Sequence, residues 1–143
     1  MPETVKTPNV FQEYFINIFR YKYIQYKGRA RRKEFWMFYL FSCIFSFVLG
    51  LFPVLGGIYS LVVMLPTICL SIRRLHDIGK SGWWLMLPLV SFIGVLVFLV
   101  LDIGVALFCM ALLFSISCIT FLAYCCLDSQ PDENQYGPNP KEA

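Results

Sequence analysis

The chain has 143 residues, of which 58% are hydrophobic, 17% aromatic and 15% charged, with a net charge of +3. A soluble domain carries nearer a quarter charged residues, so this composition argues against a water-soluble protein, and we expect no nucleic-acid partner. Residues 35–72 contain no Asp, Glu, Lys or Arg, and residues 81–127 contain one, Asp102. Because a membrane-spanning helix needs roughly 20 mostly apolar residues, each stretch is long enough for two spans. The sequence therefore predicts an integral membrane protein.

The N-terminal region has two predicted parts. Residues 1–8 are expected to be disordered. Residues 9–26 place Val10, Phe11, Tyr14, Phe15, Ile18 and Phe19 at helical spacing, with polar residues opposite. This pattern is typical of an amphipathic helix in the headgroup layer. The alternative is an ordinary helix that docks on the rest of the protein.

Residues 9–127 are predicted to form one membrane domain with four spans arranged as two hairpins. The expected spans are residues 35–52, 54–72, 83–101 and 104–127, and residues 73–82 are the polar loop between the hairpins. Asp102 is interpreted as part of a tight turn between the last two spans. The competing interpretation places it inside the membrane, where a carboxylate is costly and therefore a functional suspect.

The basic residues predict the orientation of the chain. Residues 1–34 hold eight of the twelve Lys and Arg residues, and residues 73–80 hold three more. The positive-inside rule then places the N-terminus and the 73–82 loop in the cytoplasm. Four spans return residues 128–143 to the same side, and their Pro- and Gly-rich composition predicts a flexible tail that touches the basic loops by charge attraction.

Three blocks of the sequence carry a family resemblance: GRARRKEFW at 28–36, RRLHDIGKSGWW at 73–84 and NQYGPNPK at 134–141. Together they resemble the DUF805 family of small, YhaH-like bacterial inner-membrane proteins. The resemblance implies a bacterial inner membrane and no established activity. It also implies a C-terminal block soon after a third span, so residues 103–127 look like an added span.

The polar blocks indicate an anion site. Arginine offers a planar fork that suits phosphate, and basic pockets on the cytoplasmic side bind acidic headgroups. The residues expected to bind the anion are Arg29, Arg31, Arg32, Arg73, Arg74 and Lys80. The residues expected to support them are Glu34 and Asp77, which hold the arginines, together with His76, Ser81, Trp36, Trp83 and Trp84. The alternative is that these charges only fix the topology, with Arg–Asp and Arg–Glu pairs joining the two loops.

Neither catalysis nor a metal site is expected. Adjacent residues point about 100° apart on a helix, so His76 and Asp77 are poorly placed to act together. The six cysteines form no CxxC spacing of the kind that zinc sites use, and we predict no cofactor. The sequence thus predicts a non-enzymatic module that binds acidic lipid, a membrane-protein partner or a second copy through a basic cytoplasmic face. The alternative function is an oligomeric channel or small-solute transporter. It needs a thiol- or charge-lined path, and the spans offer only scattered Ser and Thr residues with Asp102 as the sole charge.

Overall fold

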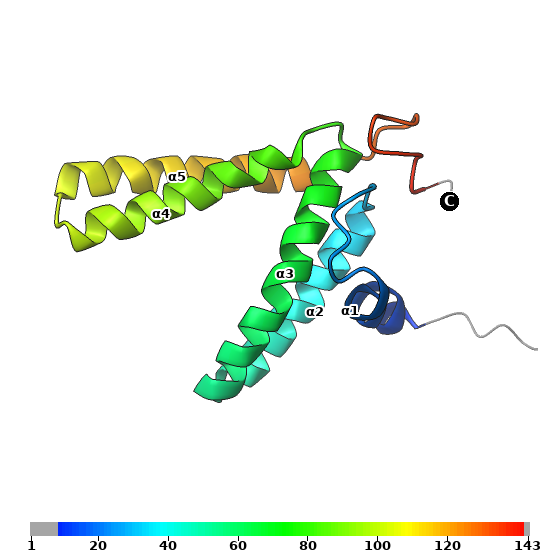
Figure 1. The fold of residues 1–143 in the computed structure, drawn as a ribbon, viewed down its shortest axis with the longest axis horizontal. Coiled ribbons are helices and arrows are strands. Elements are labelled where there is room, and N and C mark those ends of the chain that lie inside the picture. Colours follow the sequence, from blue (N-terminus) through cyan, green and yellow to red (C-terminus); the bar gives the residue numbers. More distant parts are fainter. Residues whose placement is uncertain (1–8, 142–143) are drawn as a thin grey trace, which may run out of the picture. The chain divides into compact units, whose positions relative to one another are not determined.

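A computed structural model describes residues 9–141 (Figure 1). The described residues form helices and no strand, which confirms the all-α fold. The predicted disorder of residues 1–8 lies outside the described residues. In chain order the elements are η1 (Gln12–Ile16), α1 (Asn17–Tyr21), α2 (Arg32–Gly50), α3 (Pro53–Asp77), η2 (Gly82–Leu85), α4 (Met86–Val100) and α5 (Gly104–Cys126).

Four helical segments in the described chain are long and apolar enough to cross a membrane: Arg32–Gly50, Pro53–Asp77, Gly82–Val100 and Gly104–Cys126. At most 22% of the apolar window of any of them is buried inside the protein. So much exposed apolar surface would drive aggregation in water, whereas lipid covers it. The four-span prediction is therefore confirmed.

Helix α3 is longer than the sequence predicted. It continues through RRLHD to Asp77, so this block forms the last turn of a helix, and the predicted 73–82 loop shrinks to the residues between α3 and η2. The prediction failed because hydropathy ends a span at its first charge. Arg74 is instead well placed in a last turn, where a cation interacts favourably with the helix dipole.

The chain divides into two compact units, and α3 passes from one into the other. The described part of the first unit comprises residues 9–26 and 33–70. The described part of the second comprises residues 27–32 and 71–141. Each unit is described by itself below.

An aromatic cluster joins the N-terminal helix, formed by η1 and α1, to α2 in the first unit. Because Phe11, Phe15 and Phe19 are four residues apart, they share one face of the helix. Ring centroids lie 5.0 Å apart for Phe11 and Phe41 and 5.7 Å apart for Phe15 and Phe38. After this helix, the Tyr23 hydroxyl donates to the Val62 carbonyl of α3 at 2.8 Å. The helix is docked on α2, and its expected depth in the headgroup layer stays a prediction.

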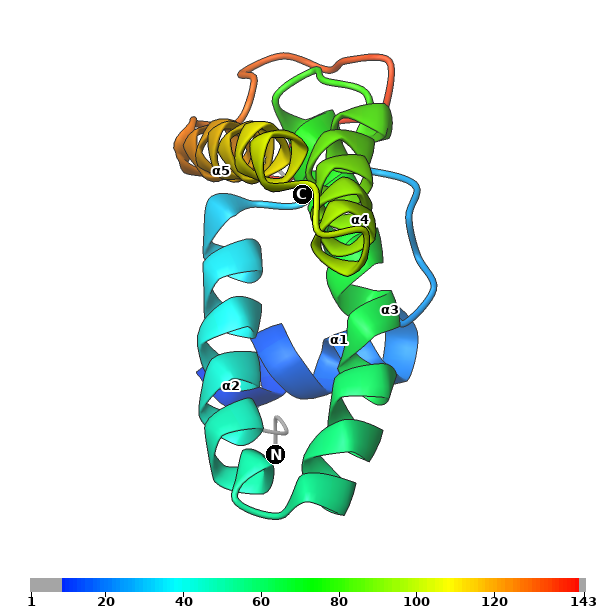
Figure 2. The same ribbon diagram turned by 90° about the vertical axis from the view of Figure 1, so that its left-hand side faces the viewer.

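Helices α4 and α5 form a tight hairpin in the second unit (Figure 2). Asp102 lies in the turn between them with φ +55°, a left-handed conformation that Asp tolerates better than most residues. This is the turn that the sequence predicted. Along the hairpin, Ser91 Oγ and Ser117 Oγ lie 3.2 Å apart, and the Phe92 and Phe114 rings are 5.6 Å apart.

Candidate functional site

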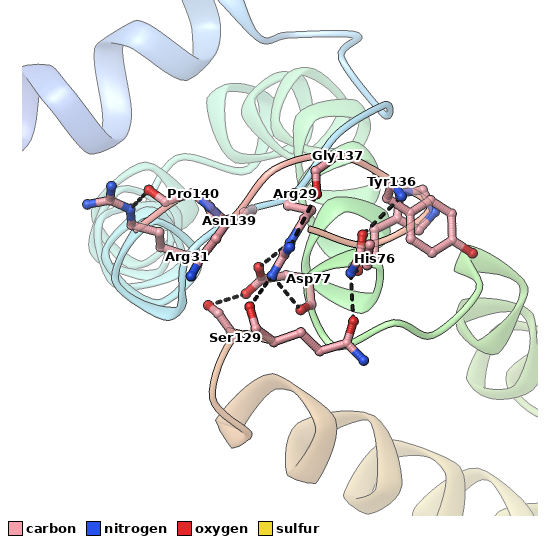
Figure 3. Close-up of polar contacts among 12 residues, drawn as sticks. Arg29, Arg31, His76, Asp77, Ser129, Tyr136, Gly137, Asn139 and Pro140 are labelled. Atoms are coloured by element: carbon pink, nitrogen blue, oxygen red, sulfur yellow. Dashed lines mark hydrogen bonds and ion pairs between the residues drawn. The ribbon is translucent and has the colours of Figure 1, made fainter. Parts of the chain in front are cut away.

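The carboxylate of Asp77, at the end of α3, is the centre of a buried polar cluster in the second unit (Figure 3). It accepts hydrogen bonds from Arg29 Nε at 3.0 Å, from Ser129 Oγ at 2.5 Å and from Arg74 Nη1. The side chains of Asp77 and Arg74 are fully buried, and that of Arg29 is 1% exposed. Two guanidinium groups thus share one carboxylate away from water, an arrangement that is stable only when their other donors are also satisfied.

Every N–H of the Arg29 guanidinium has an acceptor. Besides Nε, which donates to Asp77, Nη2 donates to the carbonyls of Gln130 at 2.6 Å and Asp77 at 3.3 Å. Nη1 donates to the carbonyls of Asp132 at 2.8 Å and Gly137 at 3.2 Å. Since arginine has five N–H donors, none of them is left for a phosphate.

Arg74 donates hydrogen bonds to carbonyl groups at the C-terminal end of α5. Its Nε donates to the Cys125 carbonyl at 3.3 Å, and its Nη2 donates to the Leu127 carbonyl, so a cation caps the last carbonyls of α5. Its Nη1 also lies 3.3 Å from the Ala30 carbonyl. Arg74 therefore links α3 to the basic segment before α2 and to the end of α5.

Helix α3 ends in a Schellman motif at Gly79. Lys80 N donates to the Leu75 carbonyl at 2.9 Å and Gly79 N to the His76 carbonyl at 3.0 Å, the 6→1 and 5→2 bonds of this motif. Gly79 has φ +72°, and a Cβ there would lie 2.5 Å from the side-chain amide of Gln130. The chain reverses here, and the C-terminal residues pack against the turn.

The C-terminal residues follow a defined path over the end of α3, which differs from the flexible tail that composition predicted. Gln130 N donates to the Asp77 carbonyl at 3.1 Å, and Asn134 Nδ2 donates to the His76 carbonyl at 3.0 Å. The Tyr136 ring stacks on the His76 ring with centroids 3.7 Å apart, and Gly137 adopts φ +131°. Composition could not reveal this path because it depends on carbonyls and guanidinium groups from distant segments. The NQYGPNPK block was the available signal.

We call this assembly of residues 27–32, 73–81 and 127–141 the loop–tail cap. The other arginines predicted to bind an anion also lie in it. Arg31 Nε donates to the Pro140 carbonyl, and Arg73 is 2% exposed while its carbonyl accepts from Ala30 N at 3.2 Å. Arg32 is exposed, with Nη1 3.1 Å from the Cys126 carbonyl.

Asp128 lies on the surface of the cap between two cations. Lys141 Nζ is 2.6 Å from one of its oxygens, and Arg32 Nη2 is 3.3 Å from the other. The hydrogen bond from Lys141, followed by that from the Ser129 backbone, holds the pKa of Asp128 below its usual value. The exposed charges of Arg32 and Lys141 are thus partly balanced.

The predicted supporting residues have separate roles. Glu34 accepts from Lys22 Nζ at 3.0 Å in the first unit. His76 Nδ1 lies 3.3 Å from the Gly28 carbonyl. Ser81 Oγ accepts from Trp83 N at 3.4 Å and caps η2. Trp36, Trp83 and Trp84 are exposed, as membrane-boundary tryptophans would be.

No group of three or more His, Cys, Asp or Glu side chains within residues 9–141 could hold a metal ion. The chemistry that the cap offers is therefore ionic and hydrogen-bonding. Lys80 is exposed, and its Nζ lies 5.8 Å from the ring centroids of both Trp84 and Tyr124.

A family match and two similar proteins agree on the family of this chain. A family described as "Protein of unknown function (DUF805)" matches residues 23–138. The chain is similar to the inner membrane protein YhaH of Escherichia coli (strain K12), with 37% identity over 131 residues that cover 83% of this chain and 89% of YhaH. It is also similar to the inner membrane protein YhaI of the same organism, with 34% identity over 137 residues that cover 90% of this chain and 96% of YhaI. No solved structure matches the chain significantly.

Proposed function

The chain belongs to the DUF805 family, and on that premise we propose that it is a non-enzymatic inner-membrane module that binds acidic lipid headgroups through its loop–tail cap. In this proposal the buried arginines build the cap, and its exposed cations meet the lipid. The observation that carries the proposal is the separation of these two sets of cations.

The buried set is occupied within the protein. Arg29 and Arg74 donate to Asp77 and to backbone carbonyls, so they have no open direction toward a headgroup. Among the described residues, Lys27 and Lys80 are exposed and form no salt bridge, while Arg32 shares Asp128 with Lys141. We therefore assign lipid binding to the exposed cations Lys27, Arg32 and Lys80 and not to the buried arginines.

The proposed orientation places the cap and the N-terminus in the cytoplasm, because all twelve Lys and Arg residues then lie on that side. Anionic lipids of that leaflet attract each Lys or Arg near the surface by about 1 kcal/mol. The channel alternative needs a thiol- or charge-lined path through the spans, and Asp102, the single charge of residues 81–127, lies in the α4–α5 turn. No specific observation favours that alternative.

Native mass spectrometry of the purified protein, with equal amounts of phosphatidylglycerol and phosphatidylcholine, tests the proposal. The wild-type protein should retain phosphatidylglycerol preferentially. Replacing three of the exposed cations of the cap should remove most of this preference, since each contributes about 1 kcal/mol. The variant is Lys27→Gln/Arg32→Gln/Lys80→Gln.

The matched control removes three exposed or half-buried cations of the first unit: Arg20→Gln/Lys22→Gln/Lys33→Gln. It changes the net charge equally and should keep the preference. Equal loss in both variants would assign the effect to net charge, and equal retention of the two lipids by the wild-type protein would refute lipid binding by the cap.

A further inference from the structure

An apolar groove lies between α4 and α5, in the half of the hairpin next to the loop–tail cap. Its volume is about 360 Å³, which falls within the usual range for small-molecule sites. Most lining side chains are apolar, and Ser91, Ser117 and Thr120 add hydroxyl groups that are hydrogen-bonded within the hairpin. The groove therefore offers contact to hydrocarbon and little to a polar ligand.

The ammonium group of Lys80 lies at the end of this groove. Trp84 and Tyr124 both line it, with ring centroids 5.5 Å apart and planes at 90°. Lys80 Nζ lies 5.8 Å from each ring, within the range of a cation–π contact. Among the described residues, this ammonium group forms no salt bridge. An anion beside these rings would therefore meet a cation already directed toward the groove.

The length of the groove fits one leaflet of a membrane. On η2 and α4 its lining runs from Trp84 to Ser91, and on α5 from Met110 to Tyr124. At about 1.5 Å per residue these stretches span about 10 and 21 Å. Half of a hydrocarbon core about 30 Å thick is about 15 Å. A groove that begins at a lysine and continues for one leaflet matches a lipid with an anionic head and an acyl chain.

We infer that the α4–α5 groove holds one acyl chain of an anionic phospholipid, whose phosphate pairs with Lys80. The inference rests on the proposed function and specifies one of its sites. Charge favours lipid over a second copy of the chain. Residues 81–127 carry a single charge, Asp102, at the opposite end of the hairpin. A second copy bound in the groove in the same membrane orientation would place its Lys80 near the first Lys80. A phospholipid instead supplies a negatively charged phosphate that can pair with Lys80.

Fluorescence quenching in nanodiscs tests this site because Trp84 lines the groove. In a Trp36→Phe/Trp83→Phe protein, Trp84 is the one remaining tryptophan. Phosphatidylglycerol with dibrominated chains should half-quench it at about a fivefold lower mole fraction than dibrominated phosphatidylcholine, the ratio that corresponds to about 1 kcal/mol for one lysine. Lys80→Gln should abolish this difference, and Lys33→Gln, which removes one exposed cation of the first unit, should leave it intact.

A second pair of variants tests the chain position. Thr120→Phe fills the groove and should weaken quenching by both brominated lipids. Ile119→Phe adds a ring beside it at a position outside the groove lining and should not. Equal quenching by the two lipids in the wild-type background would overturn the inference, as would a Lys80→Gln variant that keeps the difference.

The outcomes also separate this inference from the broader proposal. If mass spectrometry shows phosphatidylglycerol preference while Trp84 quenching shows none, the cap binds lipid elsewhere and the groove site is wrong. If neither measurement shows a preference, the proposed function fails as well. Dimers in which Trp84 is quenched by neither lipid would assign the groove to a second copy and would equally refute it.

Discussion

Replacing Asp77 with Asn should destabilise the protein by about 3–5 kcal/mol, the usual effect of removing one partner from a buried ion pair. Asn preserves the size of the side chain but removes the charge that both Arg29 and Arg74 face. It also presents one carbonyl oxygen where two carboxylate oxygens now accept from three donors, including Ser129 Oγ at 2.5 Å. Both guanidinium groups then remain buried without a counter-charge.

Unfolding in mixed micelles with increasing dodecyl sulfate, followed by tryptophan fluorescence, measures this loss. Asp102→Asn is the matched control, because it makes the same chemical change at an exposed turn where Asn tolerates φ +55°. The free energy of unfolding of this control should stay within about 0.5 kcal/mol of the wild-type value. If Asp77→Asn behaves like Asp102→Asn, the buried cluster does not hold the cap together and the reasoning is wrong.

Three further predictions concern the turns and surface of the second unit. Gly79→Ala should lower the free energy of unfolding by about 1–2 kcal/mol in the same assay, because φ +72° is unfavourable for a residue with a Cβ. An unchanged free energy of unfolding would contradict the Schellman geometry. Asp102→Val should cost a similar amount, because β-branched residues avoid φ +55°, whereas Asp102→Gly should be neutral. The contact between Asp128 and Lys141 should be fully present above the usual pKa of an aspartate and lost as the pH falls through the lowered pKa of the folded state. A carbon-13 titration of the Asp128 carboxyl group should therefore show this pKa rise in Lys141→Gln, and an unchanged midpoint would refute the contact.

Sequence reasoning identified the elements whose signals are local. The four spans follow from long apolar stretches, and the Asp102 turn follows from a single charge two residues before Gly104. The end of α3 was misplaced because a hydropathy pattern stops at Arg73, although a helix terminus accommodates cations in its last turn.

The roles of the arginines could be predicted only in part. The alternative of ion pairs that join the loops was recognisable from the acids among the cations, and Asp77 does pair with Arg29 and Arg74. What the sequence could not reveal is that backbone carbonyls of the tail satisfy the rest of the Arg29 guanidinium. A carbonyl is present at every residue, so no pattern of side chains marks which ones will accept.

The site between α4 and α5 had no sequence signal of its own. The sequence predicts Trp84 as a supporting residue of the anion site, and it does not single out Tyr124. Their rings meet only because the hairpin brings residues forty positions apart to the same end, next to Lys80.

Hydrogen–deuterium exchange of residues 128–141 tests the central claim most directly, because the account requires this tail to be folded on the buried arginine cluster. The amides of Gln130, Asn134 and Gly137 donate to backbone carbonyls and should exchange far more slowly than in a free peptide. Arg29→Lys should remove the protection, since lysine cannot supply five donors in a fixed plane, while Arg32→Lys should preserve it. A wild-type tail that exchanges at the free-peptide rate would contradict the loop–tail cap itself.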